Sequence, residues 1–143
     1  MLTKGSRIAL KVKDKILLIN PAEIMTVEAQ GNYVLVRRRS GSDLLRESMA
    51  VAAEKLRAYG FLRIHRSVIV NAACVEEIVT LETGDPVVRV QGGMEFPVSR
   101  SYRKNLRGLA PLWIGTNGFS DAESRRKKIA SGEWGVVSGE KRI

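Results

Sequence analysis

The sequence predicts a mainly β domain with one short α-helix and, near its end, a short basic helix. Apolar residues recur with a period of two along most of the chain, which is typical of strands with one buried face. Clear helical spacing appears in one segment, at about 49–59. A length of 143 residues, of which 44% are apolar, suits one globular domain with a tail rather than a disordered chain.

Turn residues divide the first half of the chain into short strands. Five strands are expected here, at 8–12, 15–19, 25–29, 33–39 and about 43–47. Lys13 and Asp14 join the first two strands in a hairpin. Gln30, Gly31 and Asn32 form a tight and exposed tip between the third strand and the fourth.

Capping residues mark the helical segments. Asn20 caps a single turn at 20–24, and Pro21 takes its first position, where the missing N–H costs nothing. In the longer helix, apolar side chains recur at spacings of three and four: Met49, Ala52, Leu56 and Tyr59. Ser48 is a suitable N-cap for this helix, and Gly60 follows as its C-terminal stop.

The second half of the chain continues as strands before the pattern fades. Four strands are expected, at 68–70, 75–81, 86–90 and 94–98. From Ser101, the segment YRKNLRGL forms a short basic helix with Tyr102, Leu106 and Leu109 on one side. Scattered apolar positions among Gly, Ser and charged residues follow, so we expect a domain at 1–116 and a basic, flexible tail at 117–143.

The charge of the chain points to a polyanionic partner. Lys and Arg number 24 against 15 Asp and Glu, which gives a net charge of +9 and a pI near 10.1. Nucleic acid is favoured over an anionic membrane surface, and charge that serves only solubility is the alternative. Basic residues gather at three places: Arg37 to Arg39, Arg63 and Arg66, and Arg100, Arg103, Lys104 and Arg107. These clusters form either one surface or separate solvated faces.

Enzyme activity has little support in the sequence. His65 and Cys74 could serve as a base and a nucleophile, but no third group to orient them is evident, and the glycine motifs that bind phosphates are absent. With one Cys and one His, neither an internal disulfide nor a metal site is expected. We expect no catalysis, no cofactor and no small-molecule substrate. Without a signal peptide or a long apolar run, the chain is expected to be cytoplasmic, with no membrane partner.

Three segments carry a family resemblance. They are IMTVEAQGNYVLV at 24–36, AYGFLRIHRSVIVNAACV at 58–75 and MEFPVSRSYRKNL at 94–106. Together they resemble the LytTR DNA-binding domain of bacterial transcription regulators, over about residues 7–109. The hallmarks of that family are matched at Phe61, at Arg63 to Ser67, at Ile69 to Asn71 and at Val98 to Arg100.

The resemblance implies an elongated fold of stacked antiparallel sheets that binds double-stranded DNA sequence-specifically in transcription regulation. Family members insert loops, rather than a recognition helix, into successive major grooves and bend the duplex. They tend to bind paired repeats as dimers, so two copies on one site are expected. The family module is usually the output domain of a response regulator. Because the first strand lies so near the start of the chain, we expect no attached receiver domain, in either a free-standing regulator or a fragment.

The resemblance also implies DNA contacts. Base readout falls to Asn32 or Tyr33 at the first tip, to Arg66 in a second loop, and to Arg100 and Ser101 in a third. Contacts that bind phosphates or position the DNA are expected from Arg63, His65, Arg103 and Lys104.

Three alternatives stay open around these contacts. His65 donates either to a phosphate or to a backbone carbonyl. Asn71 ends a strand, and an asparagine there more often bonds its own turn than a ligand. The competing class of function is a basic β-sheet module that binds a protein or RNA, although 6% aromatic residues are few for RNA recognition.

Overall fold

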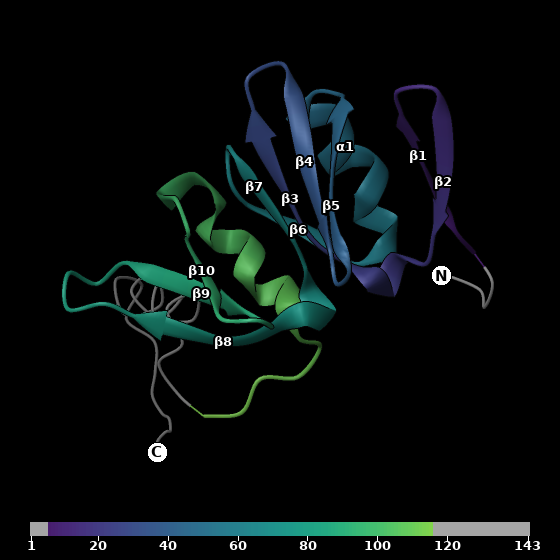
Figure 1. The fold of residues 1–143 in the computed structure, drawn as a ribbon. Helices are drawn as coiled ribbons and strands as arrows, with labels where there is room; N and C mark the ends of the chain where they lie inside the picture. Colours follow the sequence, from purple (N-terminus) through teal and green to yellow (C-terminus); the bar gives the residue numbers. More distant parts are fainter. Residues whose placement is uncertain (1–5, 116–143) are drawn as a thin grey trace. The chain divides into compact units, whose positions relative to one another are not determined.

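A computed structural model of the chain describes residues 6–115, of which those up to Pro111 belong to one compact unit (Figure 1). All strand pairs in this unit are antiparallel. The mainly β class is therefore confirmed. The predicted tail at 117–143 lies outside the described residues.

The strands form three sheets. A hairpin contains β1 (Ile8–Val12) and β2 (Lys15–Ile19). A five-stranded sheet has the order β5-β4-β3-β7-β6, with β3 (Ile24–Gln30), β4 (Tyr33–Arg38), β5 (Gly41–Arg46), β6 (Phe61–His65) and β7 (Val68–Asn71). The third sheet has the order β10-β9-β8, with β8 (Val75–Thr80), β9 (Pro86–Val90) and β10 (Met94–Pro97).

The predicted turns and caps form as expected. Lys13 adopts a left-handed φ of 56° in the β1–β2 turn. The Asn20 Oδ1 accepts a hydrogen bond of 3.0 Å from the backbone N–H of Ala22, at the start of the 3₁₀ turn η1 (Pro21–Glu23). Another 3₁₀ turn, η3 (Ala72–Cys74), links β7 to β8.

The helix predicted at 49–59 is confirmed, and its last turn tightens. Helix α1 (Met49–Leu56) begins at Ser48, whose Oγ accepts the backbone N–H of Val51 at 3.1 Å. The chain continues as the 3₁₀ turn η2 (Arg57–Tyr59) and stops at Gly60. Gly60 has a φ of 85°, a conformation that residues with a Cβ rarely adopt.

The five-stranded sheet has one face that is buried along β3, β4 and β7, and a second face that is buried at β6 and β7 but open to solvent at β5. On one face, Val27 and Ile69 pack in a core to which α1 and the β1–β2 hairpin contribute Ala52 and Leu10. Figure 1 shows α1 and this hairpin on one side of the sheet, and β8–β10 with η4 (Arg100–Leu109) on the other. Buried residues of that second side come from β6, β7, β9 and η4: Ile64, Val70, Val88, Val90 and Leu106.

The predicted basic helix after Ser101 is the 3₁₀ segment η4, and it packs along β6. Leu106 is fully buried, while Tyr102 and Leu109 are half-buried. A Cβ placed on Gly108 would lie 3.2 Å from the Leu62 side chain, so glycine lets η4 approach the strand closely. This packing fixes where the chain after β10 meets the sheet.

Candidate nucleic-acid interface

One end of the five-stranded sheet brings together turns that lie far apart in the sequence. Gln30 pairs with Tyr33 across the β3–β4 tip, and Tyr33 pairs with Arg46 at the end of β5. On the other side of β3, the backbone N–H of Ala29 donates to the Ser67 carbonyl at 2.9 Å. We call this end, formed by residues 30–33, 46–48 and 65–67, the tip edge.

The third predicted loop reaches the tip edge through β6. The backbone N–H of Ser99 donates to the Ile64 carbonyl at 3.0 Å. The Asn105 side-chain amide donates to the Arg63 carbonyl at 2.8 Å. These two bonds place the start of η4, with Arg100 and Ser101, beside the last residues of β6. All three segments predicted to read bases therefore adjoin one edge.

The side chains of the β3–β4 tip are open to solvent. Asn32 and Tyr33 are both exposed. The guanidinium carbon of Arg46 lies 6.0 Å from the centre of the Tyr33 ring. A groove of about 540 Å³ runs beside the tip, lined by Ala29, residues 31–33 and residues 46–49. Arg46 was not among the residues predicted to contact DNA, although a hairpin of the strands expected at 33–39 and 43–47 would have placed it opposite Tyr33.

The β6–β7 turn presents Arg66 and fixes His65. The Arg66 side chain is exposed and makes no hydrogen bond or ion pair within residues 6–115. The Nδ1 of His65 accepts the backbone N–H of Ser67 at 3.1 Å. A ring nitrogen that accepts a hydrogen bond carries no proton, so the proton of the neutral ring is on Nε2. The imidazole is thus held by its own turn, with Nε2–H as its remaining donor.

Arg63 is engaged by the same turn. Its Nη2 donates to the Arg66 carbonyl at 2.6 Å, and its Nε donates to the His65 carbonyl at 3.3 Å. The guanidinium also lies over the Tyr102 ring, 5.3 Å from the ring centre. Arg63 therefore links the backbone of the turn to η4.

The basic residues of η4 differ in their surroundings. Arg100, Ser101 and Lys104 are exposed. Arg103 is half-buried and forms an ion pair of 3.5 Å with Asp85, in the β8–β9 turn. Its Nε is buried and has no hydrogen-bond partner among residues 6–115.

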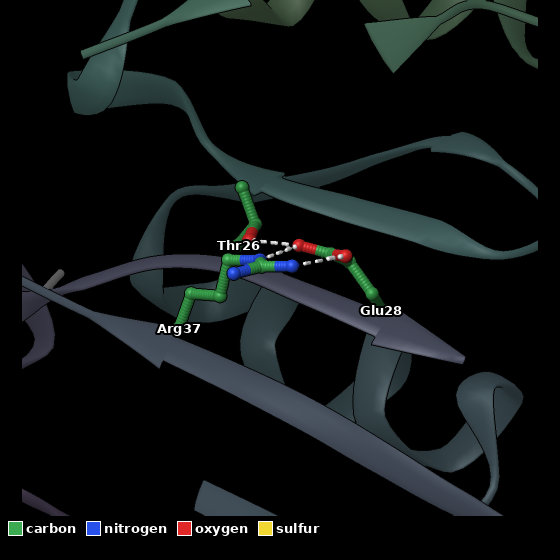
Figure 2. Close-up of polar contacts among 3 residues, drawn as sticks. All are labelled: Thr26, Glu28 and Arg37. Carbon is green, nitrogen blue, oxygen red and sulfur yellow. Dashed lines mark hydrogen bonds and ion pairs between the residues drawn. The ribbon is translucent and has the colours of Figure 1, made fainter. Parts of the chain in front are cut away.

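The run of three arginines at the end of β4, Arg37 to Arg39, does not belong to the tip edge. Figure 2 shows Arg37 bound to the Glu28 carboxylate, which also accepts the hydroxyl of the buried Thr26 at 2.8 Å. The bond between the Arg37 Nε and Glu28 is 2.5 Å long, and it raises the pKa of Arg37. Arg38 likewise binds Asp43 at 2.7 Å, which raises the pKa of Arg38. These two cations are neutralised within the domain.

Arg39 lies at the opposite end of the sheet. Its Nη1 donates to the Gln91 side chain at 2.6 Å, and its Nε donates to the Ala22 carbonyl at 3.3 Å. It thereby joins η1 to the β9–β10 turn. Of the two interpretations of the basic clusters, separate faces is correct for Arg37 to Arg39.

Ion pairing leaves positive charge at the tip edge. The basic residues that pair with carboxylates are Arg37, Arg38, Lys55, Arg57, Arg89 and Arg103. The exposed basic residues at or beside the tip edge that form no ion pair within the described part of the chain are Arg46, Arg66, Arg100 and Lys104. Unpaired exposed cations create a local positive potential, which attracts a polyanion.

The far end of β7 has a structural role. Asn71 is buried; its Oδ1 accepts the backbone N–H of Ala73 at 3.0 Å, and its Nδ2 donates to the Ile24 carbonyl at 2.9 Å. The interpretation that it bonds its own turn is confirmed. Cys74 follows, fully buried, and this burial raises the pKa of its thiol, an effect that nearby Arg39 partly offsets.

The structure gives His65 and Cys74 no means to act together. Strand β7 separates them, because His65 pairs with its first residue and Cys74 follows its last. Within residues 6–115, no three His, Cys, Asp or Glu side chains gather in a way that could hold a metal ion. In the same range, no helix has the length and apolar character to cross a membrane.

Comparison with known proteins identifies the domain. The LytTr DNA-binding domain family matches residues 14–110. The chain is 28% identical over 103 residues to the sensory transduction protein LytT of Bacillus subtilis. The aligned segment covers 72% of this chain and 43% of that protein. It is 33% identical over 92 residues to an uncharacterized response regulatory protein of Yersinia pestis, which is 64% of this chain and 37% of that protein.

The fold agrees with these relatives. A LytTr DNA-binding domain from Bacillus cereus superimposes with a TM-score of 0.64 at 25% identity, covering 76% of this chain and 99% of that one. The chain spans about two fifths of the length of the curated relatives named above. The family match covers most of the chain and includes every residue of the tip edge. This chain belongs to the LytTR family of DNA-binding domains.

Proposed function

We propose that the tip edge binds double-stranded DNA sequence-specifically, in the control of transcription. The observation that supports this most is the convergence of three loops at one end of one sheet, two of which bring exposed cations that form no ion pair within residues 6–115. These cations are Arg66 in the second loop and Arg100 and Lys104 in the third. Exposed arginine and lysine side chains suit phosphates and base edges, because they only donate hydrogen bonds. In this proposal the chain acts by binding and catalyses no reaction.

Base readout and phosphate contact divide among the loops by side-chain chemistry. Arg66 reads a guanine, since its guanidinium can donate to O6 and N7 together. Arg100 with Ser101, and Asn32 or Tyr33 at the tip, read the flanking bases. Contacts to the phosphate backbone set the position of the domain, and we assign them to Lys104, Arg103 and the Nε2–H of His65.

Loops rather than a helix enter the DNA in this proposal. Turns at one sheet edge fit the major groove, which is about 12 Å wide. Contacts from three loops to successive grooves bend the duplex toward the sheet, and two copies of the chain occupy paired repeats. A bend of this kind makes affinity depend on how easily the sequence deforms.

Arg63 acts as a positioning residue in this scheme. Its bonds to the carbonyls of His65 and Arg66 hold the backbone from which the Arg66 side chain projects. Replacement of Arg63 by alanine is therefore expected to lower sequence preference without changing the salt dependence of binding. The free-energy difference between binding the preferred duplex and binding a scrambled one measures this preference. In a double-mutant cycle, Arg63→Ala should reduce that difference by less than about 0.5 kcal/mol further when Arg66 is already alanine. The measurement is competition between the preferred duplex and a scrambled one.

A different result would assign Arg63 another role. A salt slope lowered by about one would mean that Arg63 contacts a phosphate. Arg63→Lys provides the conservative comparison, because it keeps the charge but cannot donate to two carbonyls in the same planar geometry. It should retain the salt slope and recover only part of the preference.

Selection from a random duplex pool, followed by gel shifts across salt concentrations, tests the proposed function. We expect one enriched duplex, a shift to two bound copies on paired repeats, and affinity that falls steeply with salt. Moving the site from the middle to the end of the probe should change the mobility of the complex if the duplex is bent. Equal affinity for every duplex, single strand or RNA would contradict sequence-specific readout and favour a basic interaction module.

A further inference from the structure

The end of β5 carries a basic residue outside the three predicted loops. Arg46 pairs with Tyr33 across the β4–β5 ladder, at the tip edge. Its side chain is exposed, and its guanidinium lies over the Tyr33 ring. It forms no ion pair with any carboxylate in residues 6–115. The two arginines near the other end of the β4–β5 ladder, Arg37 and Arg38, are both bound to carboxylates.

The carboxylate nearest to Arg46 in the sequence does not neutralise it, so this end of β5 keeps a positive charge. Glu47 follows it, but the Glu47 carboxylate binds Lys55 at 3.0 Å and also accepts the backbone N–H of Ser48. Glu47 is therefore neutralised by a partner on α1. Within residues 6–115, no hydrogen bond uses any of the five N–H donors of the Arg46 guanidinium, and its contact with the ring face uses none of them either.

The groove beside the tip gives a ligand room next to this guanidinium. Its volume is about 540 Å³, and its lining includes the polar residues Asn32, Tyr33 and Ser48. Ser48 Oγ accepts the Val51 N–H, which leaves the hydroxyl proton available to donate. The Asn32 side chain has amide donors at the tip. A fixed guanidinium beside neutral donors is a site for an anion with several acceptor oxygens, such as a phosphodiester.

We propose that Arg46 and Tyr33 form a contact for the phosphodiester backbone of the bound DNA, beyond the three loops. This inference rests on the proposed function. Its geometric basis is that Asn32 and Tyr33 of the tip also line the groove, together with Arg46. A DNA strand that contacts the tip and continues along the groove would therefore pass Arg46. The aromatic ring holds the guanidinium in place, which lowers the entropy lost when a phosphate binds.

The first test is the salt dependence of Arg46→Ala on the selected duplex. The slope of log affinity against log salt should fall by about one, with sequence preference unchanged, because a phosphate contact carries no base information. Arg46→Lys should keep the slope. Arg57→Ala is the matched control, since Arg57 is an exposed arginine paired with Glu54 at the far end of α1, and it should leave the slope as it is.

The second test places the contact on the DNA. One phosphate at a time is replaced by a neutral methylphosphonate along the duplex. At one backbone position, the replacement should weaken binding by the wild type but not binding by Arg46→Ala. If Arg46→Ala fails to fold, as judged by its melting curve, Arg46→Gln supplies the uncharged variant with a similar stem. An unchanged slope and no such position would overturn the inference while leaving the proposed function intact. Lost preference would show that Arg46 reads a base, and a wild type that binds no duplex would remove the proposed function itself.

Discussion

Arg66→Ala is expected to remove most of the discrimination between the selected duplex and a duplex changed at one base pair. The expected loss is about 1 to 3 kcal/mol of discrimination, or about 5- to 150-fold in relative affinity, because the proposed contact of the guanidinium with two acceptors of one guanine disappears. Arg66 is exposed in the β6–β7 turn, where its own carbonyl accepts a hydrogen bond from Arg63 and the Ser67 carbonyl accepts one from Ala29. Competition binding against duplexes changed one base pair at a time measures the effect.

Lys104→Ala is the contrasting variant for this result. Lys104 is exposed on η4 and belongs to the proposed phosphate contacts, so its loss should weaken every duplex alike and lower the salt slope by about one. Arg66→Ala should change the ranking of duplexes instead. If the two variants gave the same pattern, the division into base and phosphate contacts would be wrong.

Asn71→Ala is expected to destabilise the domain by at least about 2 kcal/mol, because it removes three hydrogen bonds that this buried side chain makes to the backbone. The groups that lose their bonds are the Ala73 N–H, the Ile24 carbonyl and the Pro21 carbonyl. Urea unfolding followed by circular dichroism measures the change. The folded fraction of this variant should keep its preference for the selected duplex, since Asn71 lies at the end of β7 away from the tip edge.

Asn32 provides the matched control for Asn71. It is the same residue type, but it is exposed at the β3–β4 tip. Asn32→Ala should leave the free energy of unfolding within about 0.5 kcal/mol of the wild type, as surface substitutions usually do. An Asn71→Ala variant as stable as the wild type would mean that the three backbone groups bonded by Asn71 find other partners. That outcome would contradict the structural role of this side chain.

Local signals in the sequence were enough to predict most of the fold. The alternation in β3 and β4, the Ser48 cap and the Gly60 stop each act within a few residues, so they could be recognised without knowing the rest of the chain. The tightening of the last helical turn into η2 could not be predicted in the same way. It depends on how the chain must turn to enter β6.

The candidate site needed information that a single sequence does not carry. Its loops could be named from their motifs, but their common edge follows from the register of β3 against β7 and from the packing of η4 on β6. It was harder still to predict from the sequence which basic residues are neutralised within the domain and which are available to a ligand. Arg37 and Arg66 have the same chemistry, and only the carboxylate of Glu28, nine residues from Arg37, separates a neutralised arginine from an available one.

The attachment of η4 to β6 has a consequence for the operator. The Ser99 N–H and the Asn105 amide bind carbonyls on consecutive residues of β6, so the second and third loops move as one rigid piece. Adding or removing one base pair between two contacted bases moves them apart or together by about 3.4 Å along the DNA helix axis. Two loops that are bonded to one β-strand cannot move relative to each other by that distance. If Arg66 and Arg100 read bases as proposed, those bases should therefore stand at a fixed separation. The β3–β4 tip is bonded to that piece through the Ser67 carbonyl, so it constrains the same register from the other side.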